Sequence, residues 1–198
     1  MTSRPPSEIV PDRGRVRLAA GGPWWKPVLV PAAVYFPLAA FLLSRAPSAA
    51  SGAALFALGL FLWTLIEYGF HGGLLHFRWK SERLYRMFSA HHAGHHEAPE
   101  DLSEVVISPL STLPKAAVVY LVLRLVLPGP AAGCALAGVV AGYVVYEAMH
   151  TAFHAPISLR GAGLEGLRKH HARHHFETPD ARFGVTTRLW DAVFGTLP

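Results

Sequence analysis

Two hexapeptides determine how the chain is organised: His-His-Ala-Gly-His-His at 91–96 and His-His-Ala-Arg-His-His at 170–175. Each follows a hydrophobic segment that ends in a spaced histidine pair, namely His71 with His76 and then His150 with His154. All 12 histidines of the 198-residue chain lie in these four places. Random placement would scatter them, so the pattern indicates a single metal-binding constellation around which the other segments are arranged.

Helical spacing would bring these imidazoles together. Residues three and four apart share one face of an α-helix, so His92, His95 and His96 are expected to point the same way. The second hexapeptide repeats this spacing, and one histidine of each, His91 and His170, falls off the shared face and is expected not to be a ligand. Ten imidazoles exceed what one ion can use and suit two metal ions with about four to six ligands each. The predicted ligands are His71, His76, His92, His95, His96, His150, His154, His171, His174 and His175.

The first pair departs from helical spacing. His71 and His76 are five apart, which is about 140° around an ideal helix. Gly72 and Gly73 lie between them, and glycine permits backbone conformations that end or bend a helix. We therefore expect the helix to end or bend here, so that both histidines point inward.

The ligand type leaves the metal open, because imidazole suits zinc, copper, iron and nickel alike. The chain has no Cys₂His₂ or Cys₄ pattern, which argues against a closed structural zinc site. Its single cysteine, Cys134, excludes an intrachain disulfide and lies in an apolar run, where a packed thiol is expected.

Three acidic residues are candidates for supporting roles. Glu67 and Glu147 precede the first histidine of their pairs by four and three residues. Each could accept the second ring N–H of a ligand or be a ligand itself, and the first role is favoured. Asp191, in the run Leu-Trp-Asp, is expected to cap a helix or form an ion pair.

Composition indicates a membrane protein. The chain is 52% hydrophobic and 16% charged, which is too apolar for an ordinary soluble domain. A segment of 19 residues spans roughly 28 Å as a helix, about one hydrocarbon thickness. The short connections at 45–51 and 128–130 predict two hairpins, with a kink from Pro31 and Pro37 in the first helix. The four hydrophobic segments are 24–44, 52–70, 107–127 and 131–149.

The predicted fold is an all-α integral membrane protein. It has four transmembrane helices in two hairpins and a cytosolic, histidine-rich helical cap that holds a dimetal site. Residues 1–23 are rich in proline and arginine and are expected to form a disordered basic arm before a membrane domain at 24–198.

Basic residues predict the orientation. Of 18 lysines and arginines, five precede or begin the first segment, four lie between the second and third, and six follow the fourth. Only Arg45 lies in a turn on the other side, so both termini and the histidines are expected in the cytoplasm. Basic residues that flank apolar segments, without a stripe of interleaved aromatics, argue against nucleic acid binding. High alanine, glycine, arginine and proline usage suggests a bacterial inner membrane.

The two halves form a pseudo-repeat, because His71 to His92 and His150 to His171 are both 21 residues apart. Each half contains a hydrophobic hairpin, a glutamate, a histidine pair, a basic stretch and a hexapeptide. Either a duplication or convergent metal geometry would produce this pattern.

The histidine spacings H-x4-H, H-x2-HH, H-x3-H and H-x2-HH resemble those of the membrane fatty acid hydroxylase/sterol desaturase superfamily. The run from Arg182 to Thr196 resembles the C-terminal FGVT…WD.VFGT stretch of that family and is most similar to the fatty acid 2-hydroxylase branch. The resemblance covers about 67–196. It implies a diiron, O₂-dependent hydroxylase with the ten histidines as ligands, although zinc can occupy such sites in a purified protein. It also implies a lipid substrate and electrons from a separate cytochrome b5 or ferredoxin-type donor.

Two other functions remain open on the sequence. Within the enzyme class, a carotenoid or sterol-type hydroxylase or desaturase uses comparable histidine boxes. In a different class, the chain could bind or transport metal in the membrane. The clustering of histidines on one side of the membrane argues against a transport path. The oligomeric state and the position of attack on the substrate are not predicted.

Overall fold

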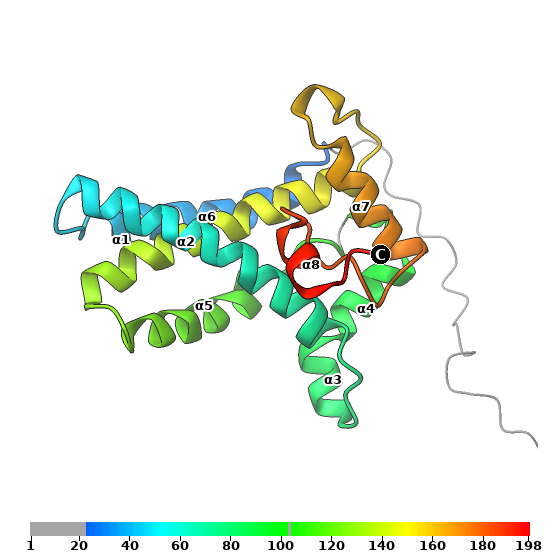
Figure 1. Cartoon of the computed structure of the whole chain (residues 1–198), viewed down its shortest axis with the longest axis horizontal. Helices are drawn as coiled ribbons and strands as arrows, with labels where there is room; N and C mark the ends of the chain where they lie inside the picture. Colours follow the sequence, from blue (N-terminus) through cyan, green and yellow to red (C-terminus); the bar gives the residue numbers. More distant parts are fainter. Residues whose placement is uncertain (1–22, 103) are drawn as a thin grey trace, which may run out of the picture.

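The computed structural model describes residues 23–102 and 104–198, and within them it contains helices and loops but no strand. The all-α prediction is therefore confirmed for this part of the chain. Figure 1 shows long helices running together in one body, with shorter helices gathered at one end. The predicted basic arm at 1–23 lies, except for Pro23, outside the described residues.

Four long helices form the body, and their bounds lie within a few residues of the predicted segments. They are α1 (Leu29–Leu43), α2 (Ala49–Phe70), α5 (Pro109–Arg124) and α6 (Gly129–His154). A 3₁₀ turn, η2 (Lys26–Val28), precedes α1, and a π-helical turn, η3 (His71–Leu75), continues α2. The shorter elements are α3 (Glu82–Phe88), α4 (Ala90–Glu97), η4 (Arg160–Ala162), α7 (Glu165–Phe176) and α8 (Leu189–Phe194).

Local signals explain where the long helices start. Ser48 and Ser51 form a reciprocal capping box at the start of α2, each side chain accepting the other's backbone N–H at 3.2 Å, which satisfies donors that the helix leaves free. Pro130 lies in the first turn of α6, where a missing N–H costs nothing. Only short connections precede α2 and α6, and the arrangement in two hairpins stays a prediction.

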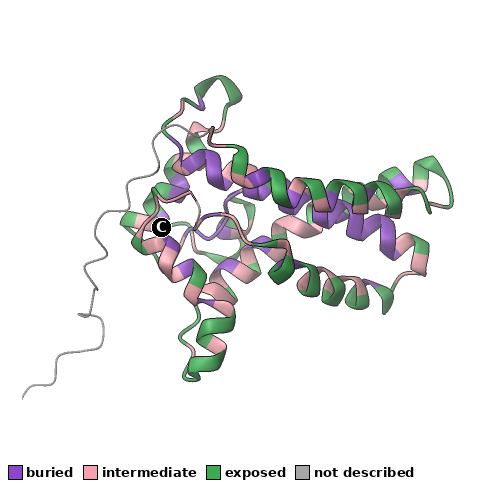
Figure 2. Ribbon diagram, turned by 180° about the vertical axis from the view of Figure 1, so that it is seen from behind, coloured by how far each residue is buried: buried purple, intermediate pink, exposed green. Residues whose placement is uncertain are grey.

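The central element of the bundle is α6, against which α1, α2 and α5 all pack. Of its 26 residues, 18 are buried, and Figure 2 shows buried residues running through the middle of the body. Small residues permit close approach: a Cβ added at Gly138 would lie 2.1 Å from the Phe56 carbonyl oxygen, and one at Gly59 would lie 2.0 Å from that of Ala135. The backbones of α2 and α6 therefore touch. Cys134 of α6 is buried, as predicted, with its thiol 3.9 Å from the Leu42 carbonyl oxygen of α1.

Three helical segments in the described chain are long and apolar enough to span a membrane: Lys26–Leu43, Ala49–Leu75 and Gly129–His154. The fourth predicted span is shorter than expected, because α5 begins at Pro109 and has 16 residues. At about 1.5 Å per residue it reaches roughly 24 Å. The four-span topology therefore stays a prediction, with three of its helices meeting the length and composition that it requires.

Candidate metal centre

All ten predicted ligands converge at one end of the bundle, although they come from four different helical segments. His71 and His76 lie at the two ends of the π turn that follows α2, and His150 and His154 lie in the last turns of α6. The others come from α4 and α7, which both lie at this end of the bundle in Figure 1.

The imidazoles form two groups of five, and in each group one ring nitrogen per residue lies within 4.8 Å of all the others. The first group contains His71, His76, His92, His96 and His174, and the second contains His95, His150, His154, His171 and His175. Each half of the pseudo-repeat supplies four histidines to its own group and one to the other. The exchanged residues, His95 and His174, occupy equivalent positions in the two hexapeptides. The two groups therefore follow the same pseudo-repeat as the two halves of the chain. The spacing alone did not predict which histidines belong to which group.

The first pair reaches its group through a change of helix type. The backbone N–H of His76 donates to the His71 carbonyl at 3.2 Å, which is the i→i+5 bond of a π-helix. This wider turn brings residues five apart onto one face, so the expected departure from α-helical geometry is observed. His150 and His154 are four apart and need no such change on α6.

The nitrogen geometry within each group fits a shared cation. The Nε2 atom of His92 lies 3.2, 2.9 and 3.1 Å from the Nε2 atoms of His71, His76 and His96. A ring nitrogen carries one proton or one lone pair, so it cannot make three hydrogen bonds. Two nitrogens that bind one metal at right angles, each at roughly 2.1 Å, are about 3.0 Å apart.

The second group shows the same spacing. Its Nε2–Nε2 distances are 3.1 Å for His95 with His150, 2.9 Å for His154 with His171, and 3.1 Å for His171 with His175. The donor sets of both groups therefore fit metal ions bound by imidazole.

Burial keeps these imidazoles uncharged. It is the main cause that lowers the pKa of His95 to about 2, that of His96 to about 3 and that of His174 to about 4, and neighbouring imidazoles lower the pKa values further. A metal ion requires neutral imidazole. Near pH 7 these ring nitrogens therefore offer lone pairs without competition from protons.

The two histidines expected not to be ligands lie outside both groups. His91 is half-exposed, with Nδ1 3.5 Å from a Glu104 carboxylate oxygen. His170 is buried and donates from Nε2 to Asp191 Oδ2 at 3.0 Å. Asp191 thus has the pairing role expected of it. Burial alone would raise the pKa of its carboxyl, but hydrogen bonds from His170, Thr196 and two backbone N–H groups hold it below the usual value.

The expected role of the two glutamates is not observed. Glu67 accepts hydrogen bonds from the backbone N–H groups of Val185 and Thr186 at 2.6 and 2.8 Å and from the Thr186 hydroxyl at 2.6 Å. The first histidine of its pair, His71, donates from Nδ1 to the Phe183 carbonyl at 2.6 Å instead. The Glu67 carboxylate, which was expected to accept the His71 N–H, therefore accepts hydrogen bonds from Val185 and Thr186 instead.

On α6 the same expectation is also wrong. Glu147 accepts from the Ile107 backbone N–H at 3.3 Å, whereas Nδ1 of His150 has no hydrogen-bond partner among the described residues. The helix places the two side chains three residues apart, but the carboxylate faces the segment that leads into α5.

Sequence reasoning missed the histidine partners that are backbone carbonyls. Ala181 accepts from His174 Nδ1 at 2.7 Å, and Phe183 accepts from His71 Nδ1. The only feature of the sequence that pointed to this segment was the Phe-Gly-Val-Thr run at 183–186, through its resemblance to the family. Side-chain identities alone give no indication that its carbonyl oxygens would reach the imidazoles.

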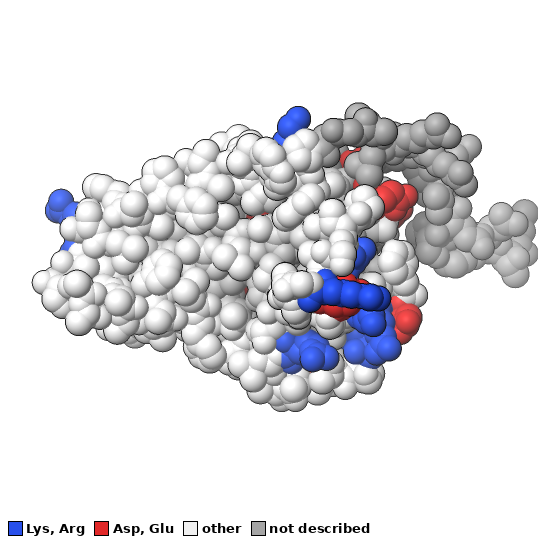
Figure 3. All heavy atoms as spheres, turned by 90° about the horizontal axis from the view of Figure 1, so that it is seen from above, with Lys and Arg blue, Asp and Glu red and all other residues white. Residues whose placement is uncertain are grey.

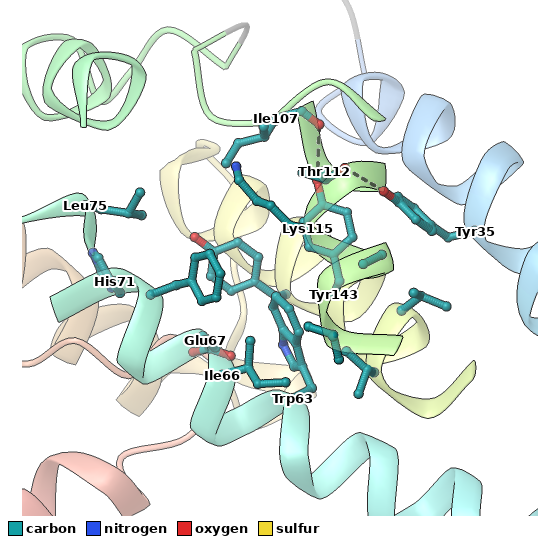
Figure 4. A pocket seen from close by; sticks show the side chains of 16 residues that line it. Tyr35, Trp63, Ile66, Glu67, His71, Leu75, Ile107, Thr112, Lys115 and Tyr143 are labelled. Carbon is teal, nitrogen blue, oxygen red and sulfur yellow. Dashed lines mark hydrogen bonds between the residues drawn. The ribbon is translucent and has the colours of Figure 1, made fainter. Parts of the chain in front are cut away.

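An apolar pocket of about 100 Å³ lies among α1, α2, α5 and α6, and His71 of the first group lines it. Figure 4 shows His71, Glu67 and Leu75 on one side and the hydrogen-bonded side chains of Tyr35 and Thr112 on the other. Those two hydroxyl oxygens are 2.6 Å apart. A second hollow, of about 490 Å³, is lined by His76, His92 and His96 together with Phe77, Trp79 and Tyr85. Histidines of the first group therefore line both an apolar pocket and a second hollow.

Residues 56–196 match the family model described as fatty acid hydroxylase. The chain belongs to the fatty acid hydroxylase family. This assignment confirms the resemblance carried by the histidine spacings and the C-terminal run.

Relatives in this family are hydroxylases of acyl chains. The fatty acid 2-hydroxylase of Macaca fascicularis is 41% identical over 145 residues, which are 72% of this chain and 39% of that protein. A dihydroceramide fatty acyl 2-hydroxylase of Arabidopsis thaliana is 33% identical over 184 residues, 88% of this chain and 73% of the relative. The chain thus spans about two fifths of the length of the first curated relatives that it matches.

The fold is also similar to a solved structure. That structure is full-length scs7p, in which only the hydroxylase domain is visible. The two share a TM-score of 0.73 and 30% sequence identity, over 87% of this chain and 66% of the other. The described fold is therefore similar to that hydroxylase domain.

Proposed function

We propose that the chain is an O₂-dependent diiron hydroxylase that inserts a hydroxyl group into a lipid acyl chain, at C2 of a fatty acyl group. The observation that carries the proposal is the pairing of two five-histidine groups with an apolar pocket among helices of membrane-spanning length. The 2-hydroxylases among the relatives support the acyl substrate and the position. They also favour this enzyme over a sterol or carotenoid hydroxylase and over a metal transporter.

Each group of five imidazoles would hold one iron ion, and iron bound there supplies the activation of O₂ that an unactivated C–H bond requires. The protein contributes the other parts of the reaction. Ile66, Phe70 and Leu75 line the pocket beside His71 and would hold the acyl chain by apolar contact. The same side chains exclude water from the reacting carbon. Electrons would come from a separate cytochrome b5 or ferredoxin-type protein.

We further propose that the chain crosses a bacterial inner membrane with α5 as a fourth span and the histidine end in the cytoplasm. Figure 3 shows charged side chains gathered near the histidine end, whereas the bundle surface on this face is almost uncharged. On and just after α5, Leu110 and Leu125 are 83% and 82% exposed, which is unfavourable in water and favourable in lipid. A lipid substrate could then enter the pocket from the bilayer.

The test is lipid analysis of cells that express the full chain under ¹⁸O₂. We expect 2-hydroxy acyl chains that carry one ¹⁸O atom, detected by mass spectrometry after hydrolysis of the total lipid. The double variant His174→Ala/His175→Ala should lose the product, whereas His91→Ala, at a half-exposed histidine outside both groups, should keep it. Iron-loaded, folded protein that yields hydroxylated sterol or carotenoid and no hydroxy acyl chain would contradict the proposal.

A further inference from the structure

Residues 181–187, here called the C-terminal strap, connect directly to two histidines of one group. The Phe183 carbonyl accepts a hydrogen bond from His71 Nδ1 at 2.6 Å, and the Ala181 carbonyl accepts one from His174 Nδ1 at 2.7 Å. Both histidines belong to the first group. A donor N–H at Nδ1 leaves Nε2 unprotonated, so each carbonyl selects the tautomer that presents a lone pair to the other imidazoles.

Two buried carboxylates hold the strap in place. Glu67 accepts three hydrogen bonds from Val185 and Thr186, and Asp191 accepts the backbone N–H groups of Phe183 and Gly184 at 2.8 and 2.9 Å. Both carboxylates are at most 3% exposed. Five hydrogen bonds to two buried side chains therefore fix the position of the two carbonyls that contact His71 and His174.

The strap also covers the first group through a side chain. The Phe183 ring lies 5.7 Å from the ring centres of His71 and His174 and 5.6 Å from that of His76. A Cβ added at Gly72 would lie 2.8 Å from the Phe183 ring, so glycine in the π turn leaves the space that this ring occupies. The backbone of the strap thus bonds to two imidazoles of the first group, and its Phe183 ring contacts these two and His76.

The second group has no counterpart of the strap. Nδ1 atoms of four of its five histidines, His95, His150, His171 and His175, are buried without a hydrogen-bond partner in the described part of the chain. Hydrogen bonds at Nδ1 orient an imidazole and raise its basicity, and losing such a partner typically weakens metal binding about 10- to 100-fold. The two groups therefore offer the same number of nitrogens with different support.

We propose that the strap, anchored by Glu67 and Asp191, makes the two metal sites unequal, so that the first group binds its ion more tightly and the second group releases its ion first. The inference rests on the proposed dimetal function. Glu67 and Asp191 are positioning residues in this account, because they act on the ligands through the strap.

The test is stepwise metal release from the purified full chain, loaded with iron without oxygen and titrated with a chelator while bound iron is counted. The wild type should release its two ions in two separate steps. Glu67→Ala should lower the affinity of the tighter site about 10- to 100-fold. Glu67→Gln, which keeps an acceptor oxygen, should recover part of the loss. Glu147→Gln changes a buried carboxylate that does not contact the strap and should leave the tighter site unchanged.

Two variants at histidines show which of the two groups is weakened by Glu67→Ala. With the second group disabled by His150→Ala, adding Glu67→Ala should weaken the remaining ion. With the first group disabled by His76→Ala, adding Glu67→Ala should change nothing. If Glu67→Ala fails to fold, Thr186→Val removes one of the three hydrogen bonds to Glu67. It should weaken metal binding less, and only when the first group is intact.

Equal losses in both backgrounds, or release of both wild-type ions in a single step, would overturn the inference while leaving the dimetal site in place. Folded wild-type protein that binds no metal ion would instead overturn the proposed function.

Discussion

The two histidine groups are built from equivalent sequences but supported by different means. In the first, α2 widens into a π turn and a distant segment of chain hydrogen-bonds to the imidazoles. In the second, a regular α-helix carries His150 and His154 directly, and most Nδ1 atoms have no described partner.

The helices that carry the two histidine pairs also differ in how deeply they are buried. In the most apolar part of Gly129–His154, 78% of the residues are buried inside the protein. The corresponding fraction for Ala49–Leu75 is 11%. A central helix packed on several sides orients its side chains by contact with neighbours. The more peripheral α2 packs chiefly against α6, and the strap hydrogen-bonds to His71 at its end. The comparison teaches that ligand geometry can be imposed by packing or by hydrogen bonds within one site.

The largest effect is expected when one ligand is removed from each group. His174→Ala/His175→Ala takes one imidazole from the first group and one from the second. We expect the iron content to fall from about two ions per chain to well below one, with loss of hydroxylation, because both sites lose a ligand. Iron content by mass spectrometry checks this, and a folded double variant that keeps both ions would contradict the assignment of these residues.

A smaller effect, confined to the first group, is expected from the π turn. Gly72→Ala should push the Phe183 ring away, because its Cβ would lie 2.8 Å from that ring, whereas a Cβ at Gly73 meets no described atom within 4 Å. We expect Gly72→Ala to weaken the first site about tenfold and Gly73→Ala to leave it unchanged. Chelator titration measures both, and equal affinities in the two variants would show that the strap does not support this group.

The packing of α6 can be tested independently of the histidines. Gly138→Ala would place a Cβ 2.1 Å from the Phe56 carbonyl, whereas a Cβ at Gly69 meets no described atom within 4 Å. Overpacking of this kind costs about 1–3 kcal/mol, so Gly138→Ala should lower the thermal unfolding midpoint in detergent. Gly69→Ala should hold or raise it, because alanine is favoured over glycine in a helix by up to about 1 kcal/mol. A Gly138→Ala midpoint at or above that of the wild type would contradict the close α2–α6 contact.

The smallest effects are expected at the two equivalent histidines outside the groups. His170→Ala leaves a buried Asp191 oxygen without its 3.0 Å donor, which should destabilise the fold by about 1–3 kcal/mol. His91→Ala removes a half-exposed side chain 3.5 Å from Glu104 and should change stability by less than about 0.5 kcal/mol. Both variants should keep two ions, and loss of an ion from His91→Ala would mean that this histidine is a ligand.

The sequence predicted which histidines gather better than it predicted the contacts that support them. Ten histidines could be selected because helical spacing is a local property, and the same property gave the helix bounds. The division into groups depends on how α4 and α7 pack together, so no local pattern determines it. The sequence predicted only that the helix ends or bends between His71 and His76. The spacing H-x4-H requires some departure from α-helical geometry, but it does not say whether the helix ends, bends or widens into a π turn.

The error at Glu67 has a similar cause. A carboxylate four residues before His71 shares its helical face, which made a contact between them plausible. The donors that occupy it instead, Val185 and Thr186, lie 118 and 119 residues further along the chain. The shorter α5 has a local origin: Ser108 accepts the Leu110 N–H and starts the helix at Pro109, so the apolar run extends beyond the helix at both ends.

The most direct test of the central claim is anomalous diffraction at the iron edge from crystals of the iron-loaded full chain. The account predicts two peaks, one among the Nε2 atoms of the first group and one among those of the second, with the first remaining stronger after brief soaking in chelator. A single peak between the groups, or ions bound elsewhere while both groups stay empty, would contradict it.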